Sequence, residues 1–280
     1  MKVLVTGAAG GLGQLIITEL LAAGHAVVAT SRNPEKAKEL PFYRQVTYLP
    51  YDINTTDHPN LFSYFQEPDT AIHLAWEKLN AYKDADHVDE ILPKHCAFLH
   101  NLLMNGLKDL TCVGTCYEYG IQEGELREDM ASLPVMPYPQ AKNDLRVYLE
   151  TLQKSLHFHL KWPRVFYVFG PIKERKNLYT LLMDAVARGD ESFNMSGGEQ
   201  TRDFMSPDEI AATLVKIALQ TKVEGIINCC SGKAVKLRDK VEGFLAEHQY
   251  TLRLNFGHYP YPDYEPMHTW GSVKKLQGIG

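Results

Sequence analysis

Several features are missing or scarce in this chain of 280 residues. It has no apolar run near the ~20 residues that span a bilayer, and Lys2 is followed by a short strand pattern rather than by the apolar segment of a signal peptide. Its five cysteines are odd in number and follow no zinc-binding spacing. We therefore expect a reduced, cytoplasmic protein without a metal site, in which the cysteines are small buried hydrophobic residues.

An excess of positive charge is also missing. The formal net charge is −5 and the isoelectric point is about 6.1, whereas proteins that bind nucleic acid cluster lysine and arginine. This argues against nucleic acid as the main partner. The hydrophobic content of 45% and the charged content of 22% are those of a globular protein, and a core of this size needs no disulfides.

The most informative segment is at the amino terminus. Residues 2–6 form an apolar strand pattern, Gly7, Gly10 and Gly13 follow at the spacing G-x-x-G-x-x-G, and an amphipathic helix pattern runs to about Ala23 before a second apolar strand. A dinucleotide diphosphate requires close backbone approach, which glycine permits, and a helix N-terminus whose free N–H groups face the phosphates. A glycine-rich turn between a strand and a helix therefore predicts a dinucleotide-binding site.

Short apolar strands alternate with helical patterns through about residue 170, which is typical of a parallel sheet with helices on both faces. Strands are expected at 2–6, 26–30, 46–48, 70–75, 110–114, 159–168 and 226–229, and helices at 95–107, 140–154, 178–188 and 237–248. Asp208 is expected to cap a helix that begins at Glu209. We predict an α/β protein with a Rossmann-type doubly wound parallel sheet in residues 1–170. Residues 171–280 would form mainly a small substrate-binding lobe, with some segments returning to the sheet.

A second informative segment is Tyr138-Pro139-Gln140-Ala141-Lys142. A spacing of four at the start of a helix places Tyr138 and Lys142 on one face, one turn apart. The pKa of a tyrosine is ordinarily about 10, and a nearby ammonium group stabilises the phenolate and lowers that pKa. The segment therefore predicts an acid–base pair, with a surface pair on a helix as the alternative.

With these segments the chain resembles the extended short-chain dehydrogenase/reductase family, in particular its NAD-dependent epimerase/dehydratase group. TGAAGGLG (residues 6–13) resembles the family's T-G-x-x-G-x-x-G, and GTCYEYG (residues 114–120) resembles S-S-x-x-x-Y-G. The resemblance extends over nearly the whole chain. Further matching segments are Asp52-Ile53, which resembles the family's adenine-contacting pair, HLAW (73–76), RVFYVFGP (164–171) and RDFMSPDEIA (202–211).

The resemblance implies roles for individual residues. Tyr138 would be the catalytic acid–base, Lys142 would hold the nicotinamide ribose, and Thr115 would hydrogen-bond the reacting oxygen. Arg202 would meet a nucleotide-sugar phosphate, with an ion pair to Asp203 or another acid as the alternative. Cys116 and Tyr117 are expected to contact substrate. The other expected cofactor contacts are Gly7, Gly10, Gly11, Leu12, Gly13, Ser31, Arg32, Asp52, Ile53, Leu74, Ala75 and Trp76, and Glu77 is expected beside Trp76 at the pocket.

Departures from the family's patterns narrow the activity. Cys116 and Tyr117 stand where the 4,6-dehydratases carry Asp-Glu, so the acid–base groups for dehydration are missing. Glu118 stands where the 3,5-epimerising reductases carry a cysteine, which disfavours double epimerisation, although Cys116 is close by. His95 stands where many relatives have an asparagine. The resemblance therefore favours a ketoreductase.

The cofactor preference is read at the end of the second strand, where an aspartate would accept the ribose 2′-hydroxyl of NAD. Ser31 and Arg32 stand there, and a hydroxyl and a guanidinium suit a 2′-phosphate, so NADP(H) is favoured and NAD(H) is possible. We predict NADPH-dependent reduction of the 4-keto group of a nucleotide-linked 6-deoxy hexulose. The alternatives are an NAD-dependent nucleotide-sugar 4-epimerase and a non-catalytic NAD(P)-sensing protein. The resemblance also implies a homodimer.

Overall fold

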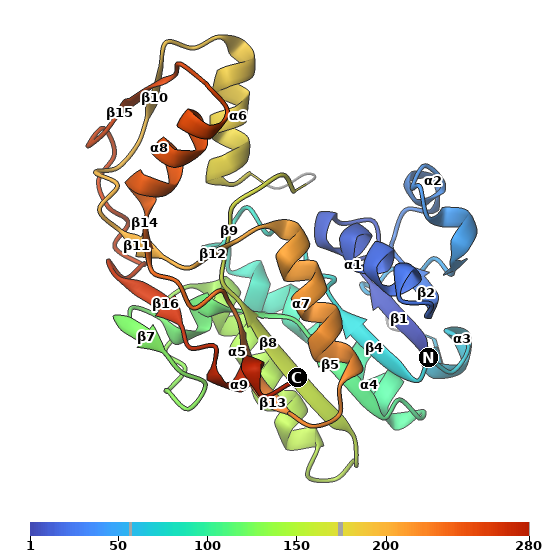
Figure 1. Cartoon of the computed structure of the whole chain (residues 1–280). Helices are drawn as coiled ribbons and strands as arrows, with labels where there is room; N and C mark the ends of the chain where they lie inside the picture. Colours follow the sequence, from blue (N-terminus) through green and yellow to red (C-terminus); the bar gives the residue numbers. More distant parts are fainter. Residues whose placement is uncertain (56–57, 173–175, 280) are drawn as a thin grey trace.

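The computed structural model describes residues 1–55, 58–172 and 176–279. At its centre is a parallel sheet with the strand order β13-β8-β5-β4-β1-β2-β3, and β6 also pairs with β8 (Figure 1). The order reverses between β1 and β4, as in doubly wound sheets. The predicted α/β class with a Rossmann-type sheet is confirmed. The strands are β1 (Lys2–Thr6), β2 (Ala26–Thr30), β3 (Thr47–Tyr48), β4 (Thr70–His73), β5 (Asp109–Cys112), β6 (Gly114–Thr115), β8 (His159–Val165) and β13 (Gly225–Cys229).

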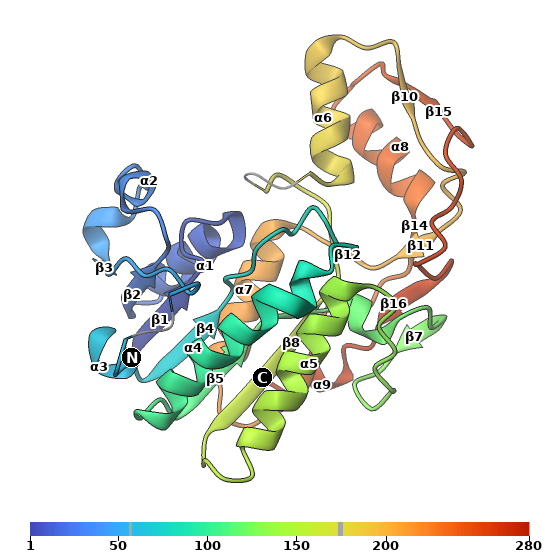
Figure 2. The same cartoon turned by 180° about the vertical axis from the view of Figure 1, so that it is seen from behind.

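Helices cover both faces of the sheet (Figures 1 and 2). Val3 and Val5 of β1 enter the hydrophobic cluster on one face and Leu4 enters the cluster on the other, because side chains alternate along a strand. No helix among the described residues is long and apolar enough to cross a bilayer. The helices are α1 (Gly11–Ala22) and α7 (Pro207–Leu219) on the first face, α3 (Leu61–Tyr64), α4 (Leu92–Met104) and α5 (Pro137–Leu152) on the second, and the short α2 (Pro34–Lys38) and α9 (Lys274–Gln277).

A smaller lobe lies beyond the carboxyl ends of the sheet strands (Figure 1). Its own buried cluster includes Leu182 and Val241. Although they follow residue 170, β13 is a strand of the central sheet and α7 packs against it. The division of the chain into two domains at residue 170 stays a prediction. The lobe and its base contain α6 (Leu178–Arg188), α8 (Leu237–Glu247) and the strand pairs β10 (Ser192–Asn194) with β15 (Arg253–Asn255), β11 (Thr201–Arg202) with β14 (Val235–Lys236), β12 (Phe204–Met205) with β9 (Tyr167–Val168), and β16 (Thr269–Gly271) with β7 (Gly124–Leu126).

Several boundaries differ from those expected. The strand expected at 110–114 is divided into β5 and β6, and the strand expected at 159–168 is divided into β8 and β9. The helix expected at 140–154 begins at Pro137. Proline is tolerated in the first turn because the N–H group that it lacks would have no intrahelical acceptor there. Tyr138 therefore lies inside the first turn of α5.

The expectation that Asp208 caps a helix from Glu209 is wrong. α7 begins at Pro207, and its N-cap is Ser206. The Ser206 hydroxyl accepts a hydrogen bond from the Glu209 N–H at 3.2 Å, and the Glu209 carboxylate accepts one from the Ser206 N–H at 2.7 Å. This reciprocal arrangement is a capping box, and Asp208 is a residue of the first helical turn.

Candidate active site

A large cavity opens along the carboxyl ends of the sheet strands and continues to the lobe. Its volume is about 1050 Å³. It lies at the point where the strand order reverses, which is where open parallel sheets bind ligands. Every residue predicted from the sequence to bind cofactor or substrate lines it, from Gly7 at one end to Arg202 at the other. The structure thus brings the predicted residues together, while their individual roles stay predictions.

The glycine turn after β1 forms a cradle that larger residues would fill. Gly7 has a φ of +69°, and a Cβ there would lie 2.9 Å from the backbone nitrogen of Ala75. A Cβ on Gly13 would collide with the carbonyl oxygen of Gly7. The N-cap of α1 is Gly10, which offers no capping side chain, and the first turn contains no acidic residue. Gly11, Leu12 and Gly13 of this first turn line the cavity without an acidic side chain among them, which fits the diphosphate of a dinucleotide.

Lys142 is a buried cation in the lining of the cavity. Only 2% of the residue is exposed, its Nζ donates to the carbonyl oxygen of Val113 at 3.0 Å, and Nζ lies 4.0 Å from the centroid of the Trp76 ring. Burial lowers the pKa of Lys142 to about 8. Lys142 lies one helical turn from Tyr138 in α5, as the sequence predicted, and its ammonium group contacts the carbonyl and the ring.

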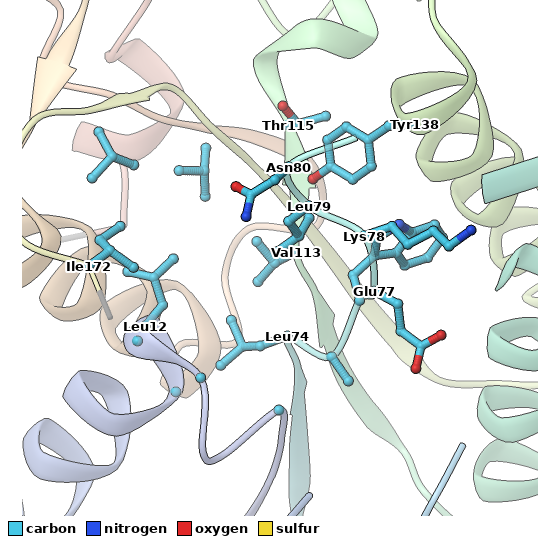
Figure 3. Close-up of a pocket in the computed structure, with 18 of the residues that line it drawn as sticks. Leu12, Leu74, Glu77, Lys78, Leu79, Asn80, Val113, Thr115, Tyr138 and Ile172 are labelled. Atoms are coloured by element: carbon cyan, nitrogen blue, oxygen red, sulfur yellow. The ribbon is translucent and has the colours of Figure 1, made fainter. Parts of the chain in front are cut away.

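Tyr138 is enclosed by aromatic rings. Its ring centroid lies 5.4 Å from that of Tyr82, 5.3 Å from that of His87 and 6.3 Å from that of Trp76. Its backbone N–H donates to the carbonyl oxygen of Tyr82 at 3.1 Å. Figure 3 shows Tyr138 and Thr115 on the same side of the cavity. Tyr82 and His87 precede α4, and no motif in the sequence assigned either of them to the site.

Thr115 is held at the end of β6 by a buried carboxylate. Its N–H donates to Oε1 of Glu118 at 2.8 Å, and its hydroxyl accepts from the N–H of Tyr117 at 3.3 Å. Glu118 also accepts hydrogen bonds from the Trp162 indole at 3.0 Å and from Arg164 Nε at 2.9 Å. Glu118 and Arg164 are both fully buried. Glu118 therefore positions Thr115, a function that the sequence analysis did not assign to it.

A chain of hydrogen bonds connects the glycine turn to His95. The Thr6 hydroxyl oxygen lies 3.2 Å from the N–H groups of Leu74 and Ala75, which donate to it, so we assign its hydrogen to Nδ1 of His73 at 2.9 Å. His73 Nε2 then donates to Nδ1 of His95 at 2.8 Å, and the hydrogen of His95 lies on Nε2. Burial lowers the pKa of His73 to about 3 and that of His95 well below its usual value, so both are neutral.

Arg202, at the lobe end, has an acidic partner. Its Nη2 donates to Glu265 Oε2 at 2.8 Å, and the Tyr117 hydroxyl donates to Oε1 of the same carboxylate at 3.0 Å. Asp203, the partner considered from the sequence, is fully buried and accepts instead from the backbone N–H groups of residues 231, 232 and 271. Arg202 thus faces the cavity as one half of an ion pair with Glu265.

Comparison with known proteins identifies the family of the chain. The model of the NAD dependent epimerase/dehydratase family matches residues 3–230. The chain belongs to this family. It is an enzyme of the NAD(P)-dependent class that modifies nucleotide sugars, as the sequence predicted; reduction as the specific reaction and NADP(H) as the specific cofactor stay predictions.

Among curated relatives, the chain is 29% identical over 273 residues to dTDP-6-deoxy-L-talose 4-dehydrogenase (NAD(+)) of Aggregatibacter actinomycetemcomitans, covering 97% of this chain and 100% of the relative. It is 25% identical to dTDP-4-dehydro-6-deoxyglucose reductase of Escherichia coli, and the match covers 86% of this chain and 79% of the relative. The chain shares its fold with the structure of a UDP-N-acetylglucosamine 4-epimerase from Methanobrevibacter ruminantium M1 in complex with UDP-N-acetylmuramic acid. The TM-score is 0.87 and the sequence identity 21%, and the match covers 100% of this chain and 91% of the other.

Within this family member, Cys116 is poorly suited to act as a base. It is buried, and burial raises the pKa of its thiol, so the thiolate is scarce near neutral pH. Burial also raises the pKa of Tyr117 well above its usual value. Both groups are protonated where they line the cavity, which agrees with the sequence-based argument against double epimerisation.

Proposed function

We propose that this chain transfers hydride between a nicotinamide dinucleotide and C4 of a nucleotide-linked 6-deoxy hexose, with reduction of the 4-keto sugar as the predicted direction. The supporting observation is the arrangement of Tyr138, Lys142 and Thr115 in the cavity that begins at the glycine turn. Two relatives are named for redox chemistry at position 4 of a dTDP-linked 6-deoxy sugar, which supports the proposal. Both relatives match most of this chain, so the proposal extends to the whole protein.

The residues around the reacting carbon have separate tasks. The glycine turn would hold the diphosphate of the dinucleotide, whose nicotinamide ring supplies the hydride. The Thr115 hydroxyl, fixed through Glu118, donates a hydrogen bond to the sugar oxygen, and Tyr138 gives that oxygen its proton or removes it. Lys142 keeps positive charge one turn from Tyr138. The rings of Tyr82, His87 and Trp76 exclude water from this side of Tyr138.

The test is an assay of the purified chain with dTDP-4-dehydro-6-deoxyglucose and either NADH or NADPH, followed by the ultraviolet absorbance of reduced nicotinamide. We expect one nicotinamide to be oxidised per sugar reduced. Tyr138→Phe is expected to lower kcat by about 100-fold or more, because the proton donor is lost. The matched control is Tyr148→Phe on the same helix, whose hydroxyl contacts His100 at 2.7 Å and does not line the cavity.

Two results would contradict the proposal. Interconversion of two nucleotide sugars without net oxidation of added NADH or NADPH would identify a 4-epimerase. An unchanged rate in Tyr138→Phe would show that this hydroxyl does not move the proton.

A further inference from the structure

The adenosine end of the cavity contains a carboxylate that the dinucleotide-binding pattern does not anticipate. In doubly wound sheets an acid at the end of the second strand accepts a hydrogen bond from the adenosine ribose, and here Ser31 stands at that end. Glu77 reaches the same end from the loop after β4. In Figure 3 its carboxylate is directed away from Thr115 and Tyr138. We propose that Glu77 accepts the adenosine ribose 2′-hydroxyl and makes this enzyme select NAD(H) over NADP(H).

The Ser31 hydroxyl already has a hydrogen-bond partner in Tyr48. The Tyr48 hydroxyl donates to the carbonyl oxygen of Ser31 at 2.9 Å, and the same phenol oxygen lies 2.9 Å from the Ser31 hydroxyl. Burial raises the pKa of Tyr48, so its single hydrogen stays on the phenol and is used by the carbonyl. The Ser31 hydroxyl must then donate to Tyr48. It can accept from a ribose hydroxyl while keeping that bond, whereas donation to a 2′-phosphate requires the bond to Tyr48 to break.

Arg32 is already paired. Its Nη1 contacts Oε1 of Glu77, and Asn54 Nδ2 donates to the same oxygen at 3.1 Å. Asn54 also donates through Nδ2 to Asp52 at 2.8 Å, so its amide hydrogen-bonds the carboxylates of both Asp52 and Glu77. Oε2 of Glu77 accepts no hydrogen bond from the part of the chain that the structure describes. The carboxylate is therefore oriented by two donors and retains one oxygen for a ligand hydroxyl.

The charges at this end oppose a 2′-phosphate. Arg32 and Lys36 line it together with Asp52 and Glu77, and both cations have partners. Two cations and two carboxylates leave no net positive charge for a group that carries nearly two negative charges. A carboxylate accepts hydrogen bonds from hydroxyls and repels phosphate oxygens. This inference opposes the NADP(H) preference predicted from Ser31 and Arg32, and it rests on the proposed binding of a dinucleotide in this cavity.

The experiment is calorimetric titration of nucleotide-free protein with NAD⁺ and NADP⁺, which needs no turnover. Wild-type protein is expected to bind NAD⁺ about tenfold or more tighter than NADP⁺. Glu77→Gln is expected to bind NAD⁺ about tenfold more weakly, since a hydrogen bond to a charged acceptor is lost, and NADP⁺ no more weakly. The matched control is Glu35→Gln, which removes an exposed carboxylate paired with Lys38 in α2, outside the cavity lining.

A second ligand isolates the contact itself. NAD⁺ that lacks the adenosine 2′-hydroxyl is expected to bind wild type more weakly than NAD⁺ does, by about the factor that Glu77→Gln causes. In Glu77→Gln the difference between the two ligands is expected to shrink, because the amide oxygen that remains is a weaker acceptor than the carboxylate. ADP-ribose and its 2′-phosphate, which carry no nicotinamide, are expected to show the same preference as NAD⁺ and NADP⁺.

The outcomes separate this inference from the proposed function. Equal or tighter wild-type binding of NADP⁺, or equal weakening of both dinucleotides by Glu77→Gln, overturns the role of Glu77. If the expected preference is found but no dTDP sugar is reduced or oxidised, the inference stands and the proposed reaction fails. Binding of neither dinucleotide overturns both.

Discussion

At the scale of single residues, the burial of Lys142 lowers stability at a position for which we propose a role in catalysis. Its ammonium group is buried beneath the Trp76 ring, and burial lowers its pKa from 10.5 to about 8. The unfolded chain therefore binds this proton more tightly than the folded chain. Between about pH 8 and about pH 10.5 the unfolded state carries more protons, so this group makes stability rise with pH across that window. Below about pH 8 both states are protonated and the penalty is complete.

Lys142→Met is accordingly expected to stabilise the fold and abolish catalysis. The pKa difference corresponds to about 3 kcal/mol, and the loss of a donor for the Val113 carbonyl costs about 1 kcal/mol or more. The variant is expected to gain about 1–2 kcal/mol of unfolding free energy near neutral pH, and this gain should shrink above about pH 10. Urea unfolding near neutral pH and above about pH 10 measures this gain in unfolding free energy. Lys154→Met, at an exposed lysine just after α5, is the control, and destabilisation of Lys142→Met at neutral pH would refute the explanation.

Glu265 is a second residue whose charge is expected to matter. Its carboxylate accepts a hydrogen bond from Arg202, so a substrate diphosphate that uses Arg202 must displace it. Glu265→Gln removes that competing charge and is expected to tighten dTDP binding by several-fold. A change of this size corresponds to the free energy of a partly buried ion pair. Equilibrium titration with dTDP measures the effect. Glu199→Gln, an exposed acid paired with Lys236 on the same lobe, serves as control; weaker dTDP binding in Glu265→Gln would show that Glu265 contacts the ligand favourably.

At the scale of elements, the start of α7 separates two capping assignments. Ser206 accepts from the Glu209 N–H, whereas Asp208 lies within the first turn. Ser206→Ala is expected to lower the free energy of unfolding by about 1 kcal/mol, because an N-terminal N–H loses its acceptor. Asp208→Ala removes only a favourable charge near the helix dipole, worth about 0.3–1 kcal/mol. Chemical denaturation of both variants distinguishes them, and a larger loss in Asp208→Ala would restore the sequence-based assignment.

Elements with strong local patterns were predictable from the sequence. β1, the glycine turn and α1 follow from apolar spacing and glycine positions, and α6 has the expected bounds of Leu178–Arg188. Two-residue strands such as β9 and β12 form by pairing with each other across the chain, so no local pattern marks them. The π-helix at His87–Ile91 likewise has no local signature that distinguishes it from the start of α4.

The same difference separates the site residues that were predicted from those that were missed. Tyr138 and Lys142 are one helical turn apart, so their spacing is visible in the sequence. Glu265 is 63 residues from Arg202, and its contact exists only because the lobe folds back over β11. Ser31 and Tyr48 meet because β2 and β3 pair. The partner of the Ser31 hydroxyl is set by that contact, which residue type alone does not reveal, so the cofactor preference predicted from Ser31 and the one proposed from Glu77 differ.

At the scale of the whole molecule, the cavity joins three structural parts. The sheet supplies the glycine turn and Thr115, α5 supplies Tyr138 and Lys142, and the lobe supplies Arg202 and Glu265. Because Tyr138 lines the same cavity as the glycine turn and Arg202, a dinucleotide on the turn and a sugar nucleotide at the lobe would share one space with Tyr138. This arrangement is the physical basis for the proposed transfer between a dinucleotide and a sugar held by its nucleotide.

The most direct test of this account is the stoichiometry of nicotinamide oxidation when the purified chain acts on dTDP-4-dehydro-6-deoxyglucose, measured in parallel for wild type and Tyr138→Phe. The account predicts one reduced nicotinamide consumed per sugar reduced, at a rate that falls by about 100-fold or more in Tyr138→Phe. Sugar conversion without net consumption of reduced nicotinamide, or an unchanged rate in Tyr138→Phe, would contradict it.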